Sequence, residues 1–300
     1  MEIFEFDYHQ TPSISEPIII CLGYFDGVHL GHQALFHAAS NEGYKVAVLT
    51  FDNSPAFVLG KIHENHYLTS NADKAEFLSD LGIDYFLLMH FDEDVAKITK
   101  DEFIEHVLKK FNIKRIYCGE DYRFGLRAEG TPEYLQNYYD VDIFALQKVN
   151  NKKIASRTIS ELIMDGKVDK VPELLGRPYR INGIVVEGNK NGRRLDFPTA
   201  NLKLDYPYLF PKIGVYMGYA DVYGTKYKAI VNVGNHPTIM PLAKPIIEVH
   251  LIDFDGILYG KDIFVEFVSY MREQIKFASA DDLKNQLEKD KALAKKSLKL

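Results

Sequence analysis

The sequence predicts two structural units in one chain: a doubly wound α/β unit, followed by a small antiparallel β-barrel that ends in a helix. Two observations predict this arrangement. Between about residues 18 and 175, short apolar runs alternate with longer amphipathic ones, as in strands that alternate with helices. After about residue 181, the amphipathic runs nearly vanish, and apolar and polar residues alternate with a period of two.

The first unit is expected to hold a parallel sheet with helices on both faces. The expected strands are Ile18–Leu22, Lys45–Phe51, Tyr85–Met89, Ile113–Cys118 and Val141–Ala145, and the expected helices include Leu30–Asn41, Asp73–Leu81, Asp101–Phe111 and Pro132–Tyr138. In such sheets, ligands bind outside the carboxyl ends of the strands. The loops after Leu22, Phe51 and Cys118 are therefore the expected site.

The change of pattern places the first domain at residues 1–170, a linker at 171–182 and the second domain at 183–300. The expected barrel strands are Ile181–Glu187, Val215–Tyr223, Tyr227–Val233, Ile246–Phe254 and Ile263–Val268. A closing helix is expected to begin at Ser279 or Ala280, because Asp281 and Asp282 suit its first turn. Leu283, Leu287 and Leu293 lie along this helix.

Composition limits the class of protein. The 300 residues are 46% hydrophobic and 26% charged, with a net charge of −6, which argues against nucleic-acid binding through a basic surface. The apolar runs are too short to cross a membrane, and the start lacks a basic targeting region, so a cytoplasmic protein is expected. The two cysteines exclude a disulfide framework. Nothing in the sequence sets the oligomeric state.

The most informative segment runs from Gly23 to His32, with the sequence G-Y-F-D-G-V-H-L-G-H, directly after the apolar run 18–22. Glycines at a strand-to-helix turn let backbone amides approach an anion, and the helix N-terminus favours phosphate. His29 and His32 are three residues apart, so on a helix beginning near Val28 they share one face and can donate to phosphoryl oxygens. The alternative is a plain βα connection with solvated imidazoles.

This segment resembles the nucleotide-binding signature of the nucleotidylyltransferase superfamily, and specifically its FAD synthetase branch. The loop Gly119–Gly125, G-E-D-Y-R-F-G, resembles the family's G-x-D-F-R-F-G loop. The family's T-F-x-P-H-P loop is only partly present as residues 50–55, where Asn53 and Ser54 replace proline and histidine.

The resemblance implies that the phosphate of FMN attacks the α-phosphorus of ATP and that pyrophosphate leaves. It assigns His29 and His32 to catalysis. Asp26 is expected near the nucleotide or its metal, with helix capping as the alternative. The further nucleotide-binding candidates in this unit are Gly23, Phe25, Gly31, Ser156 and Arg157, and the flavin-binding candidates are Asp121, Phe124 and Gly125.

One family segment departs from its pattern. The family carries S-S-T-x-I-R before the linker, whereas residues 155–160 read A-S-R-T-I-S, so only Ser156 and Ile159 match. Arg157 is a candidate to supply the missing positive charge, because a guanidinium can donate two hydrogen bonds to one phosphate. The expectation is that adenylylation persists but is weak or altered.

The second unit opens on residues 188–202, G-N-K-N-G-R-R-L-D-F-P-T-A-N-L. Its two glycines, Gly188 and Gly192, permit a loop that closely approaches phosphates, with Arg193 beside them. Thr199 and Asn201 are two apart in an extended segment and point the same way, offering hard oxygen ligands to Mg²⁺. A surface loop with a Pro-Thr turn is the alternative.

This segment is similar to the riboflavin kinase signature G-D-x-x-G-R-x-L-G-F-P-T-A-N, from which Asn189 and Asp196 depart. Later segments occur in the family's order, among them E-V-H at 248–250 and R-E-Q-I-K-F at 272–277. The resemblance implies that Glu248 is the general base for phosphoryl transfer and that Arg272 lies on the flavin side. The alternatives are an outward-facing strand residue for Glu248 and a surface salt bridge for Arg272.

Together, the two halves resemble bifunctional riboflavin kinase/FAD synthetases of the prokaryotic type. The expected substrates and products are riboflavin, FMN, FAD and ATP, with Mg²⁺ as the cofactor. Two other functions stay open. One is a riboflavin kinase whose N-terminal domain has lost activity, which Ala155, Arg157 and Ser160 favour. The other is a non-catalytic flavin or nucleotide sensor.

Overall fold

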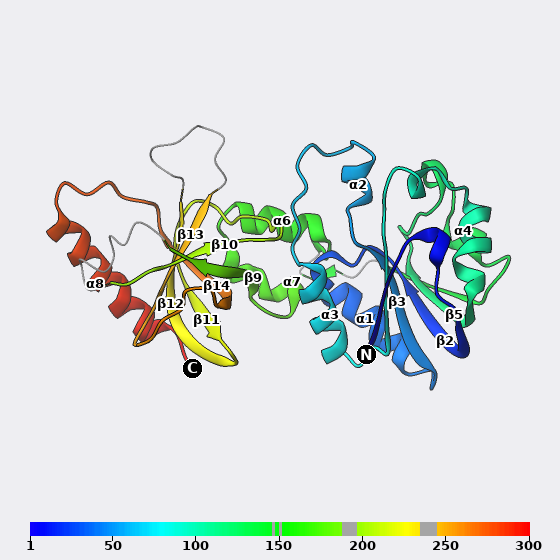
Figure 1. The fold of residues 1–300 in the computed structure, drawn as a ribbon, viewed down its shortest axis with the longest axis horizontal. Helices are drawn as coiled ribbons and strands as arrows, with labels where there is room; N and C mark the ends of the chain where they lie inside the picture. Colours follow the sequence, from blue (N-terminus) through cyan, green and yellow to red (C-terminus); the bar gives the residue numbers. More distant parts are fainter. Residues whose placement is uncertain (146–147, 150–151, 188–196, 235–244) are drawn as a thin grey trace. The chain divides into compact units, whose positions relative to one another are not determined.

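The computed structural model describes residues 1–145, 148–149, 152–187, 197–234 and 245–300. It divides into two compact units, Met1–Ser156 and Arg157–Leu300 (Figure 1). The division falls after the first residue of helix α6 (Ser156–Met164), whereas the change of sequence pattern lies near residue 170. The segment expected as a linker holds helix α7 (Pro172–Leu175) and the beginning of strand β9 (Tyr179–Val186).

The first unit is built on a six-stranded parallel sheet in the order β1-β4-β3-β2-β5-β6. Its strands are β1 (Glu2–Phe6), β2 (Ile14–Leu22), β3 (Lys45–Phe51), β4 (Tyr85–Met89), β5 (Phe111–Gly119) and β6 (Val141–Phe144). The doubly wound prediction is confirmed. Strand β4 and the second half of β2, both interior strands, are entirely apolar because both faces of the sheet are covered.

Helices cover both faces of this sheet, as Figure 1 shows. Helices α1 (Leu30–Ser40) and α3 (Asn71–Asp80) pack Leu35, Phe36 and Leu78 on one face. Helix α4 (Lys100–His106) packs Phe103 and Ile104 on the other. The shorter helices of this unit are η1 (Tyr8–Gln10), η2 (Asp26–Val28), α2 (Pro55–Val58), η3 (Val95–Lys97), η4 (Leu108–Lys110), η5 (Leu126–Ala128) and α5 (Pro132–Leu135), and a small hairpin pairs β7 (Lys148–Val149) with β8 (Lys152–Lys153).

Three expectations for this unit were wrong in detail. The helix expected to reach Phe111 ends at His106, because η4 follows and Phe111 already begins β5. The helix expected to reach Tyr138 ends at Leu135. The first strand, β1, was not predicted at all, because its pairing partner, β4, is about eighty residues away in the sequence.

The second unit contains the predicted closed barrel, in the order β10-β13-β12-β11-β14-β9. Its strands after β9 are β10 (Ala200–Lys203), β11 (Gly214–Val222), β12 (Thr225–Gly234), β13 (Ile246–Leu251) and β14 (Asp262–Arg272). The helices η6 (Val168–Lys170) and α7 precede the barrel. Helix α8 (Ala280–Ser297) begins after the N-cap Ser279, as expected.

Helix α8 covers part of the outer face of the barrel. Ala294 and Leu298 pack on Val215 and Ile230, which belong to β11 and β12. Leu293, which was expected along the helix, is 47% exposed, whereas Asp290 is buried. Leu283 and Leu287 are partly buried on the same side as Ala294 and Leu298, so the apolar spacing predicted the buried face for these two leucines and was wrong for Leu293.

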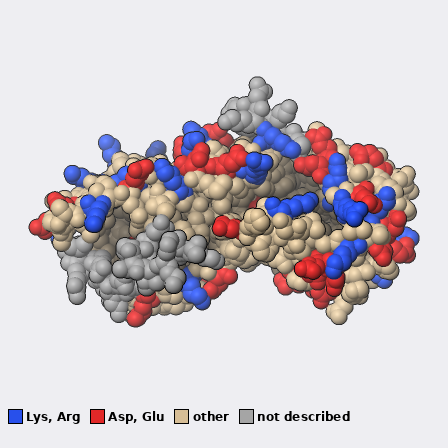
Figure 2. Space-filling view, turned by 90° about the horizontal axis from the view of Figure 1, so that it is seen from above, with Lys and Arg blue, Asp and Glu red and all other residues tan. Residues whose placement is uncertain are grey.

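Among the described residues, no helix is both long and apolar enough to span a membrane. Cys21 and Cys118 are both buried and free. Figure 2 shows Lys and Arg side chains interspersed with Asp and Glu side chains over the visible face, which agrees with the small net charge.

Candidate functional site

A cavity of about 400 Å³ opens at the carboxyl ends of strands β2, β3 and β5. The structure brings to it the three loops that the sequence singled out, and the end of the first unit adds a fourth segment. Its lining includes Gly23, His32, Phe51, Asp121 and Ser156. A pocket of this kind, at the edge where parallel strands end, is the usual ligand site of a doubly wound sheet.

His29 and His32 lie together on the wall of this cavity. Helix α1 begins at Leu30, the expected first residue, rather than near Val28, so His29 is its N-cap and accepts a hydrogen bond through Nδ1 from the backbone N–H of His32. The two rings stack, with centroids 3.5 Å apart. Because Nδ1 of His29 is an acceptor, its neutral ring carries the proton on Nε2, where it can donate.

His32 is uncharged in this setting. Burial lowers its pKa well below the ordinary value, and the charges of His29 and Lys74 lower it further. Its Nδ1 atom is buried and has no hydrogen-bond partner among the residues that the structure describes. A buried polar atom without a partner is costly, so a polar group of a bound ligand is its natural partner.

The turn between β2 and α1 has an uncommon backbone shape. Phe25, Gly27 and Val28 all have positive φ, at 52°, 81° and 43°. Gly23 must be glycine, because a Cβ atom there would lie 2.7 Å from the ring of Phe25. Such conformations persist only where surrounding contacts hold them, and they cluster at functional sites.

Phe25 packs against His32 and is almost fully buried, although it borders the cavity. It is 3% exposed, and its ring contacts the rings of His32 and Phe36, with centroids 5.1 and 4.9 Å away. Gly31, in the first turn of α1, lines the cavity and leaves room beside the imidazoles. Both residues were nucleotide-binding candidates, and both lie on this wall.

Asp26 also lines the cavity, but its carboxylate is already engaged. Oδ1 accepts hydrogen bonds from the backbone amides of Leu68 and Thr69, at 3.1 and 3.3 Å. Burial raises the pKa of Asp26, and the nearby Lys74 and these amides oppose that rise. The capping role that was the alternative for Asp26 falls to His29 instead.

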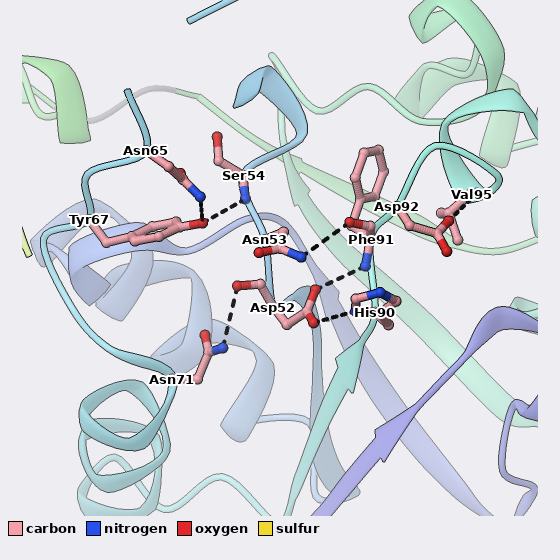
Figure 3. Close-up of polar contacts among 10 residues, drawn as sticks. All are labelled: Asp52, Asn53, Ser54, Asn65, Tyr67, Asn71, His90, Phe91, Asp92 and Val95. Atoms are coloured by element: carbon pink, nitrogen blue, oxygen red, sulfur yellow. Dashed lines mark hydrogen bonds and ion pairs between the residues drawn. The ribbon is translucent and has the colours of Figure 1, made fainter. Parts of the chain in front are cut away.

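The segment after β3 departs from the family pattern, and side chains hold it in place (Figure 3). Asp52 accepts a hydrogen bond from Phe91 N and contacts His90 Nδ1 at 2.6 Å. Asn53 Nδ2 donates to Phe91 O, and Ser54 N donates to the hydroxyl of Tyr67. Hydrogen bonds therefore fix a segment that proline fixes in the family pattern.

The loop after β5 brings Asp121, Tyr122 and Arg123 to the cavity. Phe124, a flavin-binding candidate, is instead 5% exposed and packs on Phe103, so it buttresses the loop from the core. Gly125 has φ of 71°, and a Cβ atom there would lie 2.6 Å from the backbone nitrogen of Lys100. The glycine is therefore required for shape rather than for ligand contact.

Residues 155–160, which depart from the family pattern, include the start of helix α6. Ser156 lines the cavity, and its hydroxyl donates to the carbonyl of Asp26 at 2.9 Å. Arg157, the first residue of the second unit, donates through Nε to Glu161, and its side chain is 90% exposed. In this conformation, the Arg157 guanidinium is thus held by a neighbour on its own helix.

In the second unit, the strand register aligns the kinase candidates in one row. Asn201 on β10 lies directly opposite Glu248 on β13, which lies opposite Asn232 on β12. Asn232 lies opposite Val215, and Val215 opposite Arg272. Directly opposed residues of antiparallel strands share a face. Because Val215 packs under α8, this row lies on the outer face of the barrel.

Glu248 is held within this row. Asn232 Nδ2 donates to Glu248 Oε2 at 3.1 Å, and Gln274 Nε2 donates to Asn232 Oδ1 at 2.9 Å. Thr199 is exposed and lies directly before β10, two residues ahead of Asn201. The hydroxyl, the amide oxygen and the carboxylate are the hard donors that suit Mg²⁺.

His250 ties β13 to the segment that carries Thr199. Its Nδ1 donates to the carbonyl of Pro198 at 2.9 Å, and its ring packs 5.0 Å from that of Phe197. Burial lowers the pKa of His250, so this ring stays neutral and keeps its Nδ1 proton for the carbonyl. Glu248 and His250, two residues apart, thus lie on one face of β13.

Arg272 is engaged by helix α8. Its Nη2 donates to Asp290 at 2.6 Å, and the side chains are 18% and 5% exposed. Asp290 also accepts from Gln286. The salt bridge that was the alternative for Arg272 is therefore present, although it is largely buried rather than on the surface.

Three nucleotide-binding candidates of the second unit, Gly188, Gly192 and Arg193, lie outside the described residues, as do Asn189 and Asp196.

Sequence reasoning missed four residues of these sites: Lys74, Tyr122, Asn232 and Asp290. Lys74 carries a signal, because it precedes Leu78 by one helical turn and so lies on the buried face of α3. Tyr122 stands in the loop motif itself. Asn232 and Asp290 have no local signal, since their partners come from other strands and helices.

The comparisons with known proteins fit these two sites. Residues 11–162 match the FAD synthetase family, and residues 175–298 match the riboflavin kinase family. Three relatives are each named bifunctional riboflavin kinase/FMN adenylyltransferase. The protein from Listeria monocytogenes is 34% identical over 91% of this chain and 90% of its own length. The protein from Bacillus subtilis is 35% identical over the same shares, and that from Escherichia coli is 32% identical over 98% and 97%.

A crystal structure from Streptococcus pneumoniae, described as a macrolide-efflux protein, has a TM-score of 0.90 to this chain at 31% identity, covering 98% of this chain and 99% of that one. Both units of the fold therefore occur together in a solved structure. With both family matches in order along one polypeptide and full-length relatives above 30% identity, the chain belongs to the bifunctional riboflavin kinase/FMN adenylyltransferase family.

Proposed function

We propose that the second unit phosphorylates riboflavin to FMN with MgATP and that the first unit transfers the adenylyl group of ATP to FMN, releasing pyrophosphate. The observation that carries the proposal is the presence of two separate phosphate-handling arrangements. One is the pair of stacked histidines at a helix N-terminus, and the other is the row of Asn201 and Glu248 on the barrel.

Adenylyl transfer needs positioning and charge stabilisation rather than a covalent enzyme intermediate. The N–H at His29 Nε2 and the ring of His32, whose Nδ1 has no partner among the described residues, are the side-chain groups expected to donate hydrogen bonds to phosphate oxygens. The turn 23–28 and the first turn of α1 add backbone amides and the positive end of the helix dipole. The flavin is expected against the loop that carries Asp121 and Tyr122.

Phosphoryl transfer to the 5′-hydroxyl of riboflavin needs a group that accepts its proton. Glu248 Oε2 accepts from Asn232, which leaves Oε1 to take that proton. Thr199 and Asn201 are proposed to hold Mg²⁺, which would neutralise charge on the phosphates of ATP. Arg272 is proposed to contact the flavin. In the structure its guanidinium donates to Asp290, so this contact requires that the pair with Asp290 opens or that Arg272 donates to both groups.

We place the adenylyltransferase domain at residues 1–170 and the kinase domain at residues 183–300. The end of the FAD synthetase match at residue 162 and the start of the riboflavin kinase match at residue 175 support a boundary between them. We also propose a cytoplasmic location, because both reactions consume ATP.

One experiment tests the function as a whole. The purified chain is incubated with riboflavin and MgATP, and FMN and FAD are separated by chromatography. The proposal expects FMN first and FAD after it. FMN alone would favour the second candidate, a kinase with an inactive first unit, which the outward pairing of Arg157 with Glu161 supports. Binding without either product would leave a sensor.

A further inference from the structure

The first unit buries an ammonium group that the proposed mechanism does not use. Lys74, on helix α3, is 2% exposed. Lysine is almost never buried to this extent unless its charge is paired or hydrogen-bonded, because removing the charge from water is costly. The contacts of Lys74 should therefore show what the charge does.

Those contacts lead to the phosphate-binding turn. Lys74 Nζ donates to the carbonyl of Tyr24 at 3.2 Å and lies 5.0 Å from the centre of the Tyr24 ring. Asp26 and Asp52 are the carboxylates whose charges act on it. Lys74 thus contacts the turn through the carbonyl of Tyr24 and is not among the residues that line the cavity.

The turn needs such support. Val28, a β-branched residue, has φ of 43°, and Phe25 and Gly27 also have positive φ. The left-handed region disfavours β-branched side chains most, so only surrounding contacts keep the backbone there. These residues lead directly to His29, the N-cap of α1.

Most of that support comes from one stretch of chain, residues 67–74, here called the clamp segment. Leu68 N and Thr69 N donate to the Asp26 carboxylate, and Thr69 Oγ1 accepts from Gly27 N at 3.1 Å. Lys74 completes the grip at the carbonyl of Tyr24, which also accepts from Thr50. The clamp segment therefore holds three residues of the turn: Tyr24, Asp26 and Gly27.

We propose that Lys74 is a positioning residue for adenylyl transfer, which holds the turn through the Tyr24 carbonyl and balances the buried charge of Asp26. Lys74 touches no substrate. It fixes the turn so that His29, His32 and the backbone amides meet the phosphates of ATP and FMN. The inference rests on the proposed function of the first unit.

The electrostatics of the site agree with this role. Burial lowers the pKa of Lys74 to about 8, while the charges of Asp26 and Asp52 keep it from falling further. Lys74 in turn opposes the rise in the pKa of Asp26 and helps to lower the pKa of His32. Loss of the charge on Lys74 would therefore change the electrostatic environment of both the Asp26 carboxylate and the His32 imidazole.

The test compares variants of the full chain in two assays: FAD formation from FMN and MgATP, and FMN formation from riboflavin and MgATP. Lys74→Met removes the charge and keeps the length of the side chain. It is expected to lower kcat/KM for FAD formation about 100-fold, because small displacements of a positioned site have effects of that size. FMN formation, in the other unit, should be unchanged and so reports that the chain is folded.

Two further variants separate charge from packing. Lys74→Arg keeps the charge and should retain at least about a tenth of the wild-type kcat/KM. The double variant Lys74→Met/Asp26→Asn also removes the carboxylate that Lys74→Met leaves without its partner. Its kcat/KM for FAD formation should be about tenfold higher than that of Lys74→Met alone. Lys97→Met is the matched control, because Lys97 forms an exposed pair with Asp94 and should behave as wild type.

The outcomes decide between the claims. Lys74→Met that forms FAD as fast as Lys97→Met would overturn the inference, as would Lys74→Arg that is as inactive as Lys74→Met. If Lys74→Met also lost riboflavin phosphorylation, the comparison of Lys74→Arg with wild type would decide alone. A wild-type chain that forms no FAD would contradict the proposed function itself, and the inference with it.

Discussion

At the scale of single residues, the two sites work by holding a few groups in one protonation state and one orientation. His29 is fixed by its own helix, through the hydrogen bond from His32 N to Nδ1. Glu248 is fixed from a neighbouring strand by Asn232. His250 is kept neutral by burial, so that it donates to Pro198. Each is a short-range contact made possible by a larger element.

The contact between Asn232 and Glu248 can be tested through the pH dependence of the kinase. Asn232→Ala removes a hydrogen bond to a charged group and should lower kcat for FMN formation about tenfold, with little change in KM for riboflavin. Asn232→Asp puts a second carboxylate beside Glu248, which should raise the apparent pKa of the base and move the pH profile upward. An Asn232→Asp profile that coincides with wild type would show that Asn232 does not act through Glu248.

The pair of His90 and Asp52 gives a prediction for stability. The hydrogen bond to Asp52 raises the pKa of His90, so the pair stabilises the folded chain fully below the unfolded value of 6.5 and loses this effect as pH rises through the folded value. Both side chains are partly exposed, at 44% and 27%, so about 0.5 kcal/mol is expected.

The measurement is the melting temperature of His90→Gln against wild type. The variant should melt about 1–2 °C lower at pH 5.5, and the difference should shrink at pH 8.5. His63→Gln, at an exposed histidine, is the control at both values. A difference that grows with pH would contradict the sign of this linkage.

At the scale of elements, the shapes of turns decide where the site residues lie. The turn between β2 and α1 and the loop between β5 and η5 both depend on positive φ and close backbone approach. Strand register does the same in the barrel, where it aligns Asn201, Glu248 and Asn232. Helix α8 adds Asp290, which holds Arg272.

Gly125 allows this dependence to be measured. Gly125 and Gly60 have similar φ, 71° and 66°, but a Cβ atom meets the backbone of Lys100 only at position 125. Gly60→Ala should cost about 1 kcal/mol of folding stability through φ alone. Gly125→Ala should cost about 1–3 kcal/mol more and should lower FAD formation, because its loop lines the cavity. Denaturant unfolding of both variants checks this, and equal costs would contradict it.

The elements also show what sequence could and could not predict. The motif from Gly23 to His32 predicted its strand, turn and helix because all three are local. Period-two alternation predicted the barrel strands. The family resemblance singled out Glu248 as a site residue, but that it lies opposite Asn201 was shown only by the strand register. Three features could not be predicted, because each depends on a partner distant in sequence that no local pattern encodes. They are strand β1, the buried pair of Arg272 with Asp290, and the hydrogen bond from Lys74 to Tyr24.

At the scale of the whole molecule, the chain combines a wound parallel sheet and a closed barrel, and each carries its own set of proposed phosphate-binding residues. The product of the proposed kinase, FMN, is the substrate of the proposed adenylyltransferase. Because the two sites share no residue, the account requires that either activity can be removed without the other.

The most direct test crosses two variants with two substrates. Glu248→Ala should convert FMN to FAD at the wild-type rate, but form FMN from riboflavin about 100-fold more slowly or worse, and Asn201→Ala should behave in the same way. His32→Ala should turn riboflavin into FMN normally and accumulate it, with little FAD. If any of these variants lost both activities while remaining folded, the account of two independent sites acting in series would be wrong.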